Sequence, residues 1–401
     1  MKIGVIGWSR NLHSFTLVCL NHLGYLGLSQ DHTIFFREAE FCLGDNYTSL
    51  RPDHLASDER WQQGYSKVRP WRDEAVDAVL SFALPLWTDY LKIPAHTPYI
   101  QFLPCERLLV DQRLLRMSDM QSLRACHNKK NCWVLTPTLW SASGIVRSGM
   151  RPERVLVVSH GLTADQTSPT HRQPREISKD RPFRLLNVGA MTSNKGIAEA
   201  FCIVLGIYRE LQKPVHLTLK GLSSSYGSHE LIQKASKTAL QIMNASKDEV
   251  DYLRRHITYI GQDMSHADMQ TLYSDADAYI SPYRSEGFNL PVLEAMGHGL
   301  PVLVTAGGAC DDFLPPGYPM AIPARIQAYG NDGSAELSCN IPSGIRLLKT
   351  LIEDTQLYDN CAKQCWQAAK LLTWENVTSE LLSKIATATG ASPLPPARLS
   401  L

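Results

Sequence analysis

The sequence predicts an α/β fold in which parallel strands are buried between helices. Short apolar runs rich in Val, Ile and Leu alternate with longer amphipathic segments, and the alternation recurs in the second half of the chain. Strands buried on both faces read as such continuous runs, whereas helices place apolar residues at every third or fourth position. With 401 residues, 44% of them hydrophobic, the chain is long enough for two domains of this kind.

The first half of the chain supplies enough strands for one sheet. Six apolar runs have the length and composition of buried strands: 2–7, 32–36, 77–82, 98–103, 132–136 and 155–158. The first run lacks the long apolar core and the cleavage site of a signal peptide, so we interpret it as a strand. Together the runs predict an N-terminal domain over residues 1–165.

A polar stretch over residues 166–182, with three prolines, interrupts this pattern and predicts an exposed linker. Five further strand candidates follow it, at 183–189, 215–221, 257–261, 277–282 and 300–305. They predict a second domain of the same architecture over residues 183–370. Helical spacing then predicts a terminal helix over 371–390, and residues 391–401 form a tail that can bury little.

The composition argues against several classes of partner. Because 40 basic and 39 acidic residues are spread along the chain, the net charge of +1 creates no field that would gather nucleic acid or an anionic membrane. No apolar stretch is long enough for a transmembrane segment. Ten scattered cysteines are typical of reduced thiols, so we expect a cytoplasmic protein.

The segment EGFNLPVLE, from Glu286 to Glu294, is the strongest functional signal. It follows a strand candidate and begins a helix near Leu290 or Pro291, where proline is tolerated in the first turn. Backbone amides at such a helix start can hold a phosphate at the carboxyl end of a parallel strand. In isolation, the two glutamates are more simply interpreted as a helix cap and a solvated surface residue.

With the following GHGLPVLVTAGG, this segment closely resembles the donor-binding signature of the retaining GT-B glycosyltransferases of the GT4 type, which has two glutamates separated by seven residues. The resemblance covers nearly the whole chain and is strongest from about 183 to 310. It implies two Rossmann-like domains facing across a central cleft, with the terminal helix packing back on the first. It also implies that the chain moves a sugar from a nucleotide-diphosphate sugar to an acceptor.

The resemblance implies a role for each part of the segment. Glu286 contacts the hydroxyls of the donor sugar, and Glu294 accepts hydrogen bonds from the ribose. The diphosphate is held by backbone amides of the residues between them: Gly287, Phe288, Asn289 and Leu290.

A second stretch, LLNVGAMTSNKGIAEAF, matches the start of the family's donor domain. Gly189 is the glycine of the turn, and Lys195 matches the phosphate-binding lysine, which the resemblance makes a catalytic residue. By itself the stretch is equally well an ordinary strand, turn and helix with a solvated lysine. Ala190 departs from the family, which carries Arg there, so one of two cations expected on the diphosphate is missing.

Two arginines are candidates to replace the missing cation. Arg284 comes just before Glu286, and Arg10 lies in the loop that begins at Gly7 and lines the cleft near the phosphates in the family. This loop has no GxGxxG sequence, so the dinucleotide-binding fingerprint is absent. Each arginine alone is more simply explained as an exposed surface residue.

The first domain offers two further candidates. Glu106 stands where the family has an acidic residue and would orient the acceptor nucleophile or close the cleft, unless it forms a surface ion pair with Arg107. His160 matches a loop that faces the cleft, although a structural histidine explains it equally well.

We expect no metal ion and no cofactor beyond the nucleotide-sugar co-substrate. Asp275 and Asp277 form a DxD sequence, but they end a helix and start a strand, and Asp311 and Asp312 have no further carboxylates nearby. Neither pair predicts an oxygen cage.

Two alternative functions remain. Ala190, together with Thr163 where the family often has Asp, is compatible with a non-catalytic nucleotide-sugar-binding or partner protein. The second alternative is a GT-B relative that couples an unusual nucleophile in a natural-product pathway. The donor nucleotide, UDP or GDP, stays open because residues 259–265 would recognise the base through backbone groups, and the acceptor stays open as well.

Overall fold

The computed structural model describes residues 1–39, 47–83, 93–94, 96–110, 131–167 and 181–390, and these form two compact units. Unit 1 comprises Met1–Gly44, Ser57–Gly161 and Leu372–Leu401, and unit 2 comprises Asp45–Ala56 and Leu162–Leu371. The predicted tail and most of the predicted linker, residues 168–180, lie outside the described residues.

Unit 1 is built on a parallel sheet with the strand order β3-β2-β1-β4-β5-β6-β7. Its strands are β1 (Lys2–Gly7), β2 (Thr33–Glu38), β3 (Arg69–Pro70), β4 (Ala78–Ser81), β5 (Tyr99–Phe102), β6 (Cys132–Thr136) and β7 (Val155–Val157). All six predicted strand candidates of the first half are present. The strand β3 was not predicted, because a two-residue edge strand leaves no periodic pattern in the sequence.

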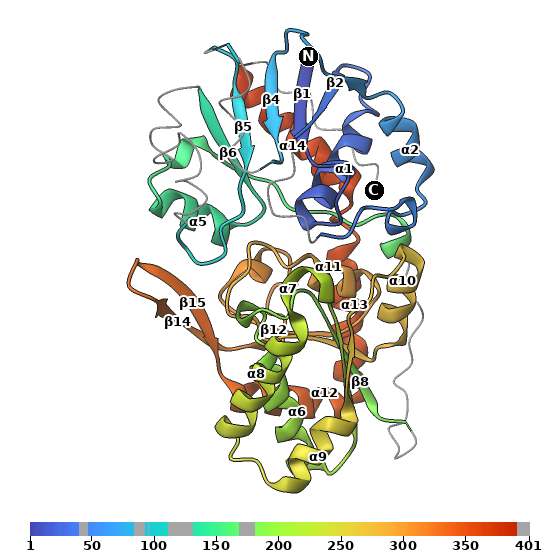
Figure 1. Cartoon of the computed structure of the whole chain (residues 1–401), viewed down its shortest axis with the longest axis vertical. Helices are drawn as coiled ribbons and strands as arrows, with labels where there is room; N and C mark the ends of the chain where they lie inside the picture. The colour runs from blue at the N-terminus through green and yellow to red at the C-terminus, as the bar shows by residue number, and fades with distance from the viewer. Residues whose placement is uncertain (40–46, 84–92, 95, 111–130, 168–180, 391–401) are drawn as a thin grey trace. The chain divides into compact units, whose positions relative to one another are not determined.

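Helices cover this sheet, with one of them supplied by the end of the chain (Figure 1). They are α1 (Ser14–Leu26), α2 (Glu59–Tyr65), α5 (Leu139–Arg147), the 3-10 turn η3 (Pro152–Arg154) and α14 (Trp374–Thr389). The terminal helix α14 packs against α1, where Thr378 Oγ1 lies 2.8 Å from Nδ1 of the buried His22.

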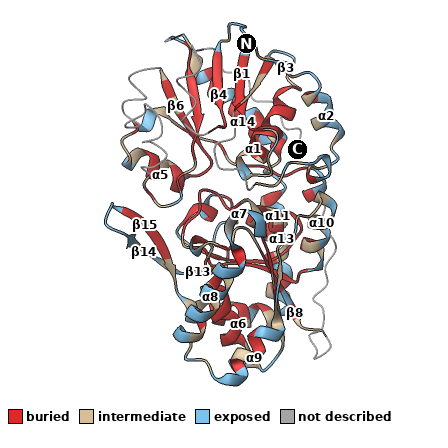
Figure 2. Cartoon of the chain, viewed as in Figure 1, coloured by how far each residue is buried: buried red, intermediate tan, exposed pale blue. Residues whose placement is uncertain are grey.

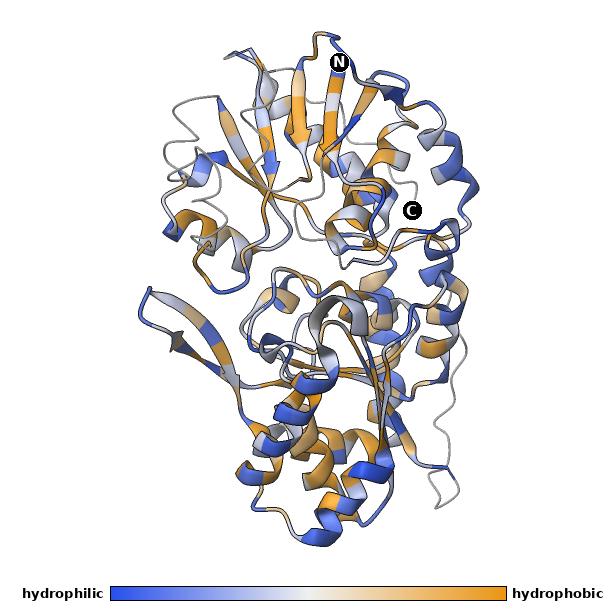
Figure 3. Ribbon diagram, in the orientation of Figure 1, coloured by the Kyte–Doolittle hydropathy of each residue, from blue (hydrophilic) through white to orange (hydrophobic). Residues whose placement is uncertain are grey.

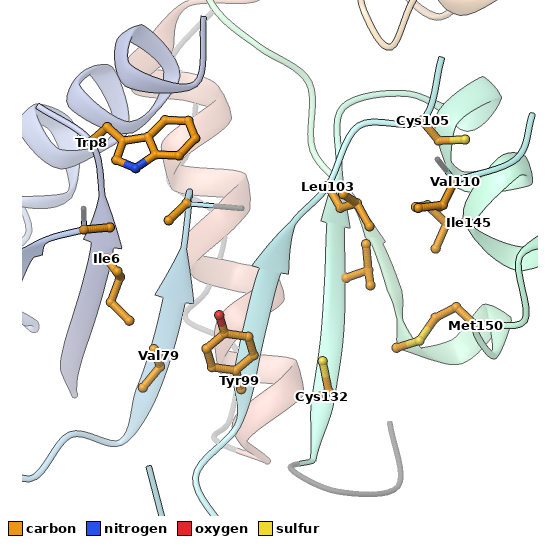
Figure 4. Close-up of a cluster of buried hydrophobic side chains, with 13 residues drawn as sticks. Ile6, Trp8, Val79, Tyr99, Leu103, Cys105, Val110, Cys132, Ile145 and Met150 are labelled. Atoms are coloured by element: carbon orange, nitrogen blue, oxygen red, sulfur yellow. The ribbon is translucent and has the colours of Figure 1, made fainter. Parts of the chain in front are cut away.

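Apolar side chains from the strands and from α5 form a core in unit 1 (Figure 4). Ile6, Val79 and Tyr99 come from three neighbouring strands, and Ile145 from α5 belongs to the same cluster. Each of the four is no more than 2% exposed, which explains why the sequence of these strands is continuously apolar.

Histidine and aromatic rings meet at the carboxyl ends of the unit 1 strands. His22 stacks on Phe82, which directly follows β4, and its ring centroid lies 5.2 Å from that of Trp374. His160 lies between Phe102 and the same Trp374, at centroid distances of 5.7 and 5.8 Å. Burial lowers the pKa of His22 and of His160 to about 3, so both imidazoles are neutral near pH 7.

Unit 2 contains a second parallel sheet, with the strand order β10-β9-β8-β11-β12-β13. Its strands are β8 (Phe183–Val188), β9 (Val215–Lys220), β10 (Ile257–Ile260), β11 (Ala278–Ser281), β12 (Val302–Thr305) and β13 (Ala321–Ile322). The five predicted strands of the second half are therefore present, and the short edge strand β13 adds a sixth. Figure 3 shows that the strands of both sheets carry mainly hydrophobic residues.

The helices of unit 2 connect these strands and cover the sheet. They are α6 (Ile197–Leu211), α7 (Ser223–Tyr226), α8 (Ser228–Ile242), α9 (Lys247–His256), α10 (His266–Asp275), α11 (Leu290–Gly297), α12 (Ile341–Glu353) and α13 (Thr355–Ala369), with the 3-10 turns η1 (Pro52–His54), η4 (Asp165–Thr167), η5 (Ser193–Lys195) and η6 (Ala309–Asp312). Figure 2 shows the sheet strands and α6 largely buried, while α8 and α9 carry much of the exposed surface.

An antiparallel hairpin of β14 (Ala324–Tyr329) and β15 (Ser334–Cys339) forms a separate two-stranded sheet in unit 2. The sequence pattern did not predict it. Ile326 and Tyr329 on β14 are 59% and 40% exposed, whereas Leu337 on β15 is 1% exposed. Because polar residues and glycine interrupt its apolar positions, this segment lacks the pattern of a buried strand.

The boundaries of the units differ from the predicted domain limits in two places, apart from a shift of one residue at Leu371. The chain passes between units at Gly161 and Leu162, slightly before the predicted boundary at residue 165. The stretch Asp45–Ala56 belongs to unit 2, although it precedes most of unit 1 in the sequence. Such an assignment depends on packing between distant segments, which local periodicity does not encode.

Neither a membrane-spanning helix nor a metal-ligand cluster is found in the described parts of the chain. No helix there is both long and apolar enough to cross a bilayer. The same residues contain no group of three or more His, Cys, Asp or Glu side chains placed to hold a metal ion.

Candidate donor-binding site

The strand order of unit 2 places a ligand-binding position between β8 and β11. From β8 the chain continues to β9 on one side, and from β11 it continues to β12 on the other. In open parallel sheets, loops diverge at such a reversal and leave a binding position beyond the carboxyl ends of the two strands. The two sequence segments singled out above follow these two strands.

Lys195 and Glu286 meet at this position. Lys195 ends the turn η5 after β8, and Glu286 lies in the turn after β11. Lys195 Nζ donates to Oε1 of Glu286 at 2.5 Å, and the two side chains are 22% and 6% exposed. Reduced solvent screening strengthens this ion pair relative to a surface pair. A cation and a carboxylate that can bind phosphate and hydroxyl groups are thus held side by side.

Asn194 and Gly196 lock together the two loops that carry this pair. The backbone carbonyl of Asn194 accepts from the amide of Arg284 at 2.7 Å, and its side-chain amide donates to the carbonyl of Ser285 at 3.1 Å. Gly196 adopts a φ of +69°, and a Cβ there would lie 1.9 Å from the carbonyl oxygen of Pro282. Only glycine fits this close approach without displacing the loop.

The turn between Glu286 and α11 is buried and well defined. Asn289 is the N-cap of α11 with a φ of 77°, a left-handed conformation that asparagine tolerates better than most residues. Its side-chain amide donates to Ser281 Oγ at the end of β11, at 2.9 Å. Phe288 packs on Phe313 with ring centroids 4.8 Å apart. The amides of Gly287 to Leu290 are therefore carried by a rigid turn beside Glu286.

Glu294 lies one turn into α11 and is partly buried. Its carboxylate accepts from the hydroxyl of Tyr273 at 2.6 Å and from the side-chain amide of Gln166 at 3.3 Å. Burial raises the pKa of Glu294, and the hydrogen bonds from Tyr273 and Gln166 oppose the shift. The structure therefore does not place Glu294 as a solvated surface side chain.

The structure directs Arg284 away from the role of replacement cation. Its Nε donates to Glu199 on α6 at 2.9 Å, and its Nη1 lies 3.4 Å from Glu336 on β15. Two carboxylates thus already balance this guanidinium, which ties the hairpin to the turn after β11.

Gly189 lies at the end of β8 with a φ of +152°, and a Cβ there would lie 3.6 Å from Lys195 Cε.

The candidates of the first half of the chain all lie in unit 1. Gly7 ends β1, where a Cβ would lie 2.3 Å from Cys19 Sγ, and Arg10 in the following loop is exposed. Glu106 is exposed, and its backbone carbonyl accepts from Trp140 Nε1 at 2.7 Å. His160 is 7% exposed and belongs to the ring cluster of unit 1, where burial keeps it neutral.

Several residues around the site were missed from the sequence. They are Gln166, Asn194, Gly196 and Tyr273. Gly196, which follows Lys195 directly, carried a usable signal, since glycine at a helix start indicates a close approach of two backbones. The others act through partners distant in the sequence and leave no local pattern.

Comparisons with known proteins give a family match for this part of the chain. Residues 182–328, which lie in unit 2, match the family described as Glycosyl transferases group 1. The matched range includes both Lys195 and Glu286. Among curated proteins, no sequence matches this chain significantly.

Solved structures show that the fold is that of GT-B glycosyltransferases. The chain is similar to HepE of Anabaena, solved with UDP and glucose, with 14% identity, a TM-score of 0.63 and coverage of 96% of this chain and 100% of HepE. Sucrose-phosphate synthase of Thermosynechococcus elongatus is 13% identical, with a TM-score of 0.64 and coverage of 98% and 100%. A glycosyltransferase of Rickettsia africae is 12% identical, with a TM-score of 0.60 and coverage of 96% and 98%.

Proposed function

We propose that the chain is a retaining glycosyltransferase of the GT4 type that uses a nucleotide-diphosphate sugar as donor. The observation that carries the proposal is the contact between Lys195 and Glu286 at the reversal of strand order in unit 2. The family match over 182–328 and the GT-B fold support it. The solved complexes of HepE with UDP-glucose make a UDP-sugar the first donor to test.

The proposed site divides the donor into three parts. Lys195 and the amides at the start of α11 hold the diphosphate, where the positive end of the helix dipole favours an anion. Glu286 accepts hydrogen bonds from the sugar hydroxyls. Glu294 exchanges its present bond to Tyr273 or Gln166 for the ribose hydroxyls.

In the proposed reaction, the bond between the anomeric carbon and the diphosphate oxygen breaks, and both electrons leave with the diphosphate. The acceptor hydroxyl then attacks the oxocarbenium-like centre from the same face, and its proton passes to the departing phosphate oxygen. Lys195 is a cation of the site that can stabilise the leaving group, whereas Ala190 has no charge and Arg284 is paired with Glu199 and Glu336.

Donor binding and turnover test this proposal directly. Isothermal titration of the full chain with UDP and GDP should show saturable binding of at least one nucleotide. A screen of nucleotide sugars with and without acceptors should then show nucleotide release, and NMR of the product should show retention at the anomeric carbon. Because the site is proposed to need no metal, EDTA should leave the activity unchanged. Absence of nucleotide binding would exclude an intact donor site.

Truncation of Glu294 should weaken donor binding. In Glu294→Ala, the ribose hydroxyls lose a charged acceptor. We therefore expect nucleotide binding to become weaker by roughly 1.5 to 3 kcal/mol. Titration with the nucleotide diphosphate measures this loss. Glu353→Ala at the end of α12 in the same unit is an exposed control. Equal affinities of Glu294→Ala and wild type would rule out the ribose contact.

A nucleotide-sugar-binding protein without turnover is the second candidate function. It is favoured by the ion pairs of Arg284 with Glu199 and Glu336. Because of these pairs, Arg284 does not replace the cation that is missing at Ala190. Slow hydrolysis of the donor in the absence of an acceptor would support the enzyme. Tight donor binding with no hydrolysis and no transfer would support the binding protein.

A further inference from the structure

Residues 47–56 precede most of unit 1 in the sequence, yet they pack within unit 2. Thr48 Oγ1 lies 3.3 Å from Ser224 Oγ on α7, the helix that follows β9. Further along, η1 packs against α10, the helix that follows β10. The segment 47–56 therefore extends from the end of β9 to the end of β10.

Asp263, in the loop after β10, holds this segment in place. Arg51 Nη1 forms an ion pair with Oδ2 of Asp263, and His54 Nε2 lies 3.0 Å from the same oxygen. His54 is 8% exposed, and the side chain of Asp263 is 21% exposed. Asp263 therefore accepts from two donors, the buried His54 and the half-exposed Arg51.

Lys220 joins the loops after β9 and β10 to one another. Its ammonium donates to the carbonyl of Gly221 at 2.6 Å and to the carbonyl of Gln262 at 3.0 Å. Burial lowers the pKa of Lys220, and the nearby carboxylate of Asp263 opposes this shift. The amide of Gly221 also donates to the carbonyl of Ile260 at 3.0 Å. The two loops thus form one support for the segment 47–56.

The contacts of Glu294 indicate which part of the donor lies nearest this support. The Lys195–Glu286 pair marks the diphosphate and sugar end of the proposed site. Glu294, the proposed ribose contact, is bonded to Tyr273 on α10, and η1 packs on that same helix. Asp263 lies three residues before α10 begins at His266. Through α10, the proposed ribose contact is therefore connected to Asp263 and the segment 47–56.

Resting on the proposed function, we propose that Asp263 positions the segment 47–56 beside the nucleobase of the donor. Asp263 is then a positioning residue that acts through Arg51 and His54. The part of the ligand that the segment contacts is the base of a nucleoside diphosphate. Release of the segment should weaken binding of nucleotides, while a probe that has the diphosphate but no base should be unaffected.

Variants of the full chain test this separation. For Asp263→Asn and Arg51→Gln, titration with UDP, GDP and inorganic pyrophosphate should give a Kd about five- to tenfold higher for the preferred nucleotide and unchanged for pyrophosphate. The KM for the donor should rise more than kcat falls. Arg51→Lys, which keeps the charge, should recover much of the lost affinity. Asp251→Asn is the matched control, because it removes only the exposed pair with Arg254 on α9.

The combined variant R51Q/D263N should lose little more affinity than either single change, because the two residues act through one contact. Wild-type nucleotide affinity in R51Q and D263N would overturn the inference, as would an equal loss of pyrophosphate affinity. If D263N fails to fold, R51Q decides alone, since the Arg51 side chain is 48% exposed. Failure of the wild-type chain to bind any nucleoside diphosphate would overturn the proposed function itself, which distinguishes the two failures.

Discussion

Replacing Glu286 by glutamine should reduce kcat by about 10²- to 10³-fold. The change keeps the size of the side chain but removes the charge that pairs with Lys195 and would accept hydrogen bonds from the donor sugar. Lys195 would then lose this ion pair in a site where Glu286 is 5% exposed, so the position of the cation should also be less well fixed. Steady-state transfer from the donor identified by the nucleotide-sugar screen measures the effect.

Glu210→Gln provides the control for this variant. Glu210 also forms an ion pair in unit 2, in which its Oε2 lies 3.3 Å from Lys349 Nζ. Unlike Glu286, both side chains of this pair are more than a third exposed. Its loss should leave kcat near the wild-type value. Full turnover by Glu286→Gln, with thermal stability equal to that of the control, would remove Glu286 from the catalytic residues.

Acid should destabilise unit 1 through His22 and His160. Both have a pKa of about 3 in the folded chain, because burial disfavours the charged imidazole, against about 6.5 in the unfolded chain. The unfolded state therefore binds protons first, so stability is fully present above about pH 6.5 and is lost as the pH falls toward 3. At about pH 5 each histidine should cost about 2 kcal/mol of unfolding free energy.

His22→Gln should make unit 1 less sensitive to acid. Glutamine removes the titrating ring but can still bond Thr378, so the loss of stability between about pH 7.5 and pH 5 should shrink by about 2 kcal/mol. Urea unfolding followed by tryptophan fluorescence is suitable, because Trp374 contacts both histidines. His229→Gln, at an exposed position, is the control. An unchanged pH dependence in His22→Gln would contradict the assignment.

Much of the fold followed from local patterns in the sequence. All eleven predicted strand candidates appear in the two sheets, because strands that are mostly buried carry mainly apolar residues. The short strands β3 and β13 and the β14–β15 hairpin were missed. Strands of two residues and a hairpin with one exposed strand do not require such a run of apolar residues.

The candidate site was predictable where its residues form a compact motif. Lys195 and Glu286 lie in the loops after β8 and β11, and Glu294 lies in the helix α11 that follows, so the strand pattern also indicated their positions. The pairing of Arg284 with Glu199 and Glu336 was not predictable. An arginine next to a binding turn has the same local sequence whether it faces a ligand or two carboxylates.

By itself, the sequence determined the α/β class, the strand runs and the two turns that carry the proposed donor site. These features depend on residues that are close together in the chain. The spacing of apolar residues indicates strands and helices, and glycine and proline favour turns through their backbone conformations. The tertiary structure decided which side chains meet. The Lys195–Glu286 contact spans 91 residues and the Arg51–Asp263 contact spans 212. Such contacts depend on the order of strands in the sheet and on packing, which no local pattern specifies.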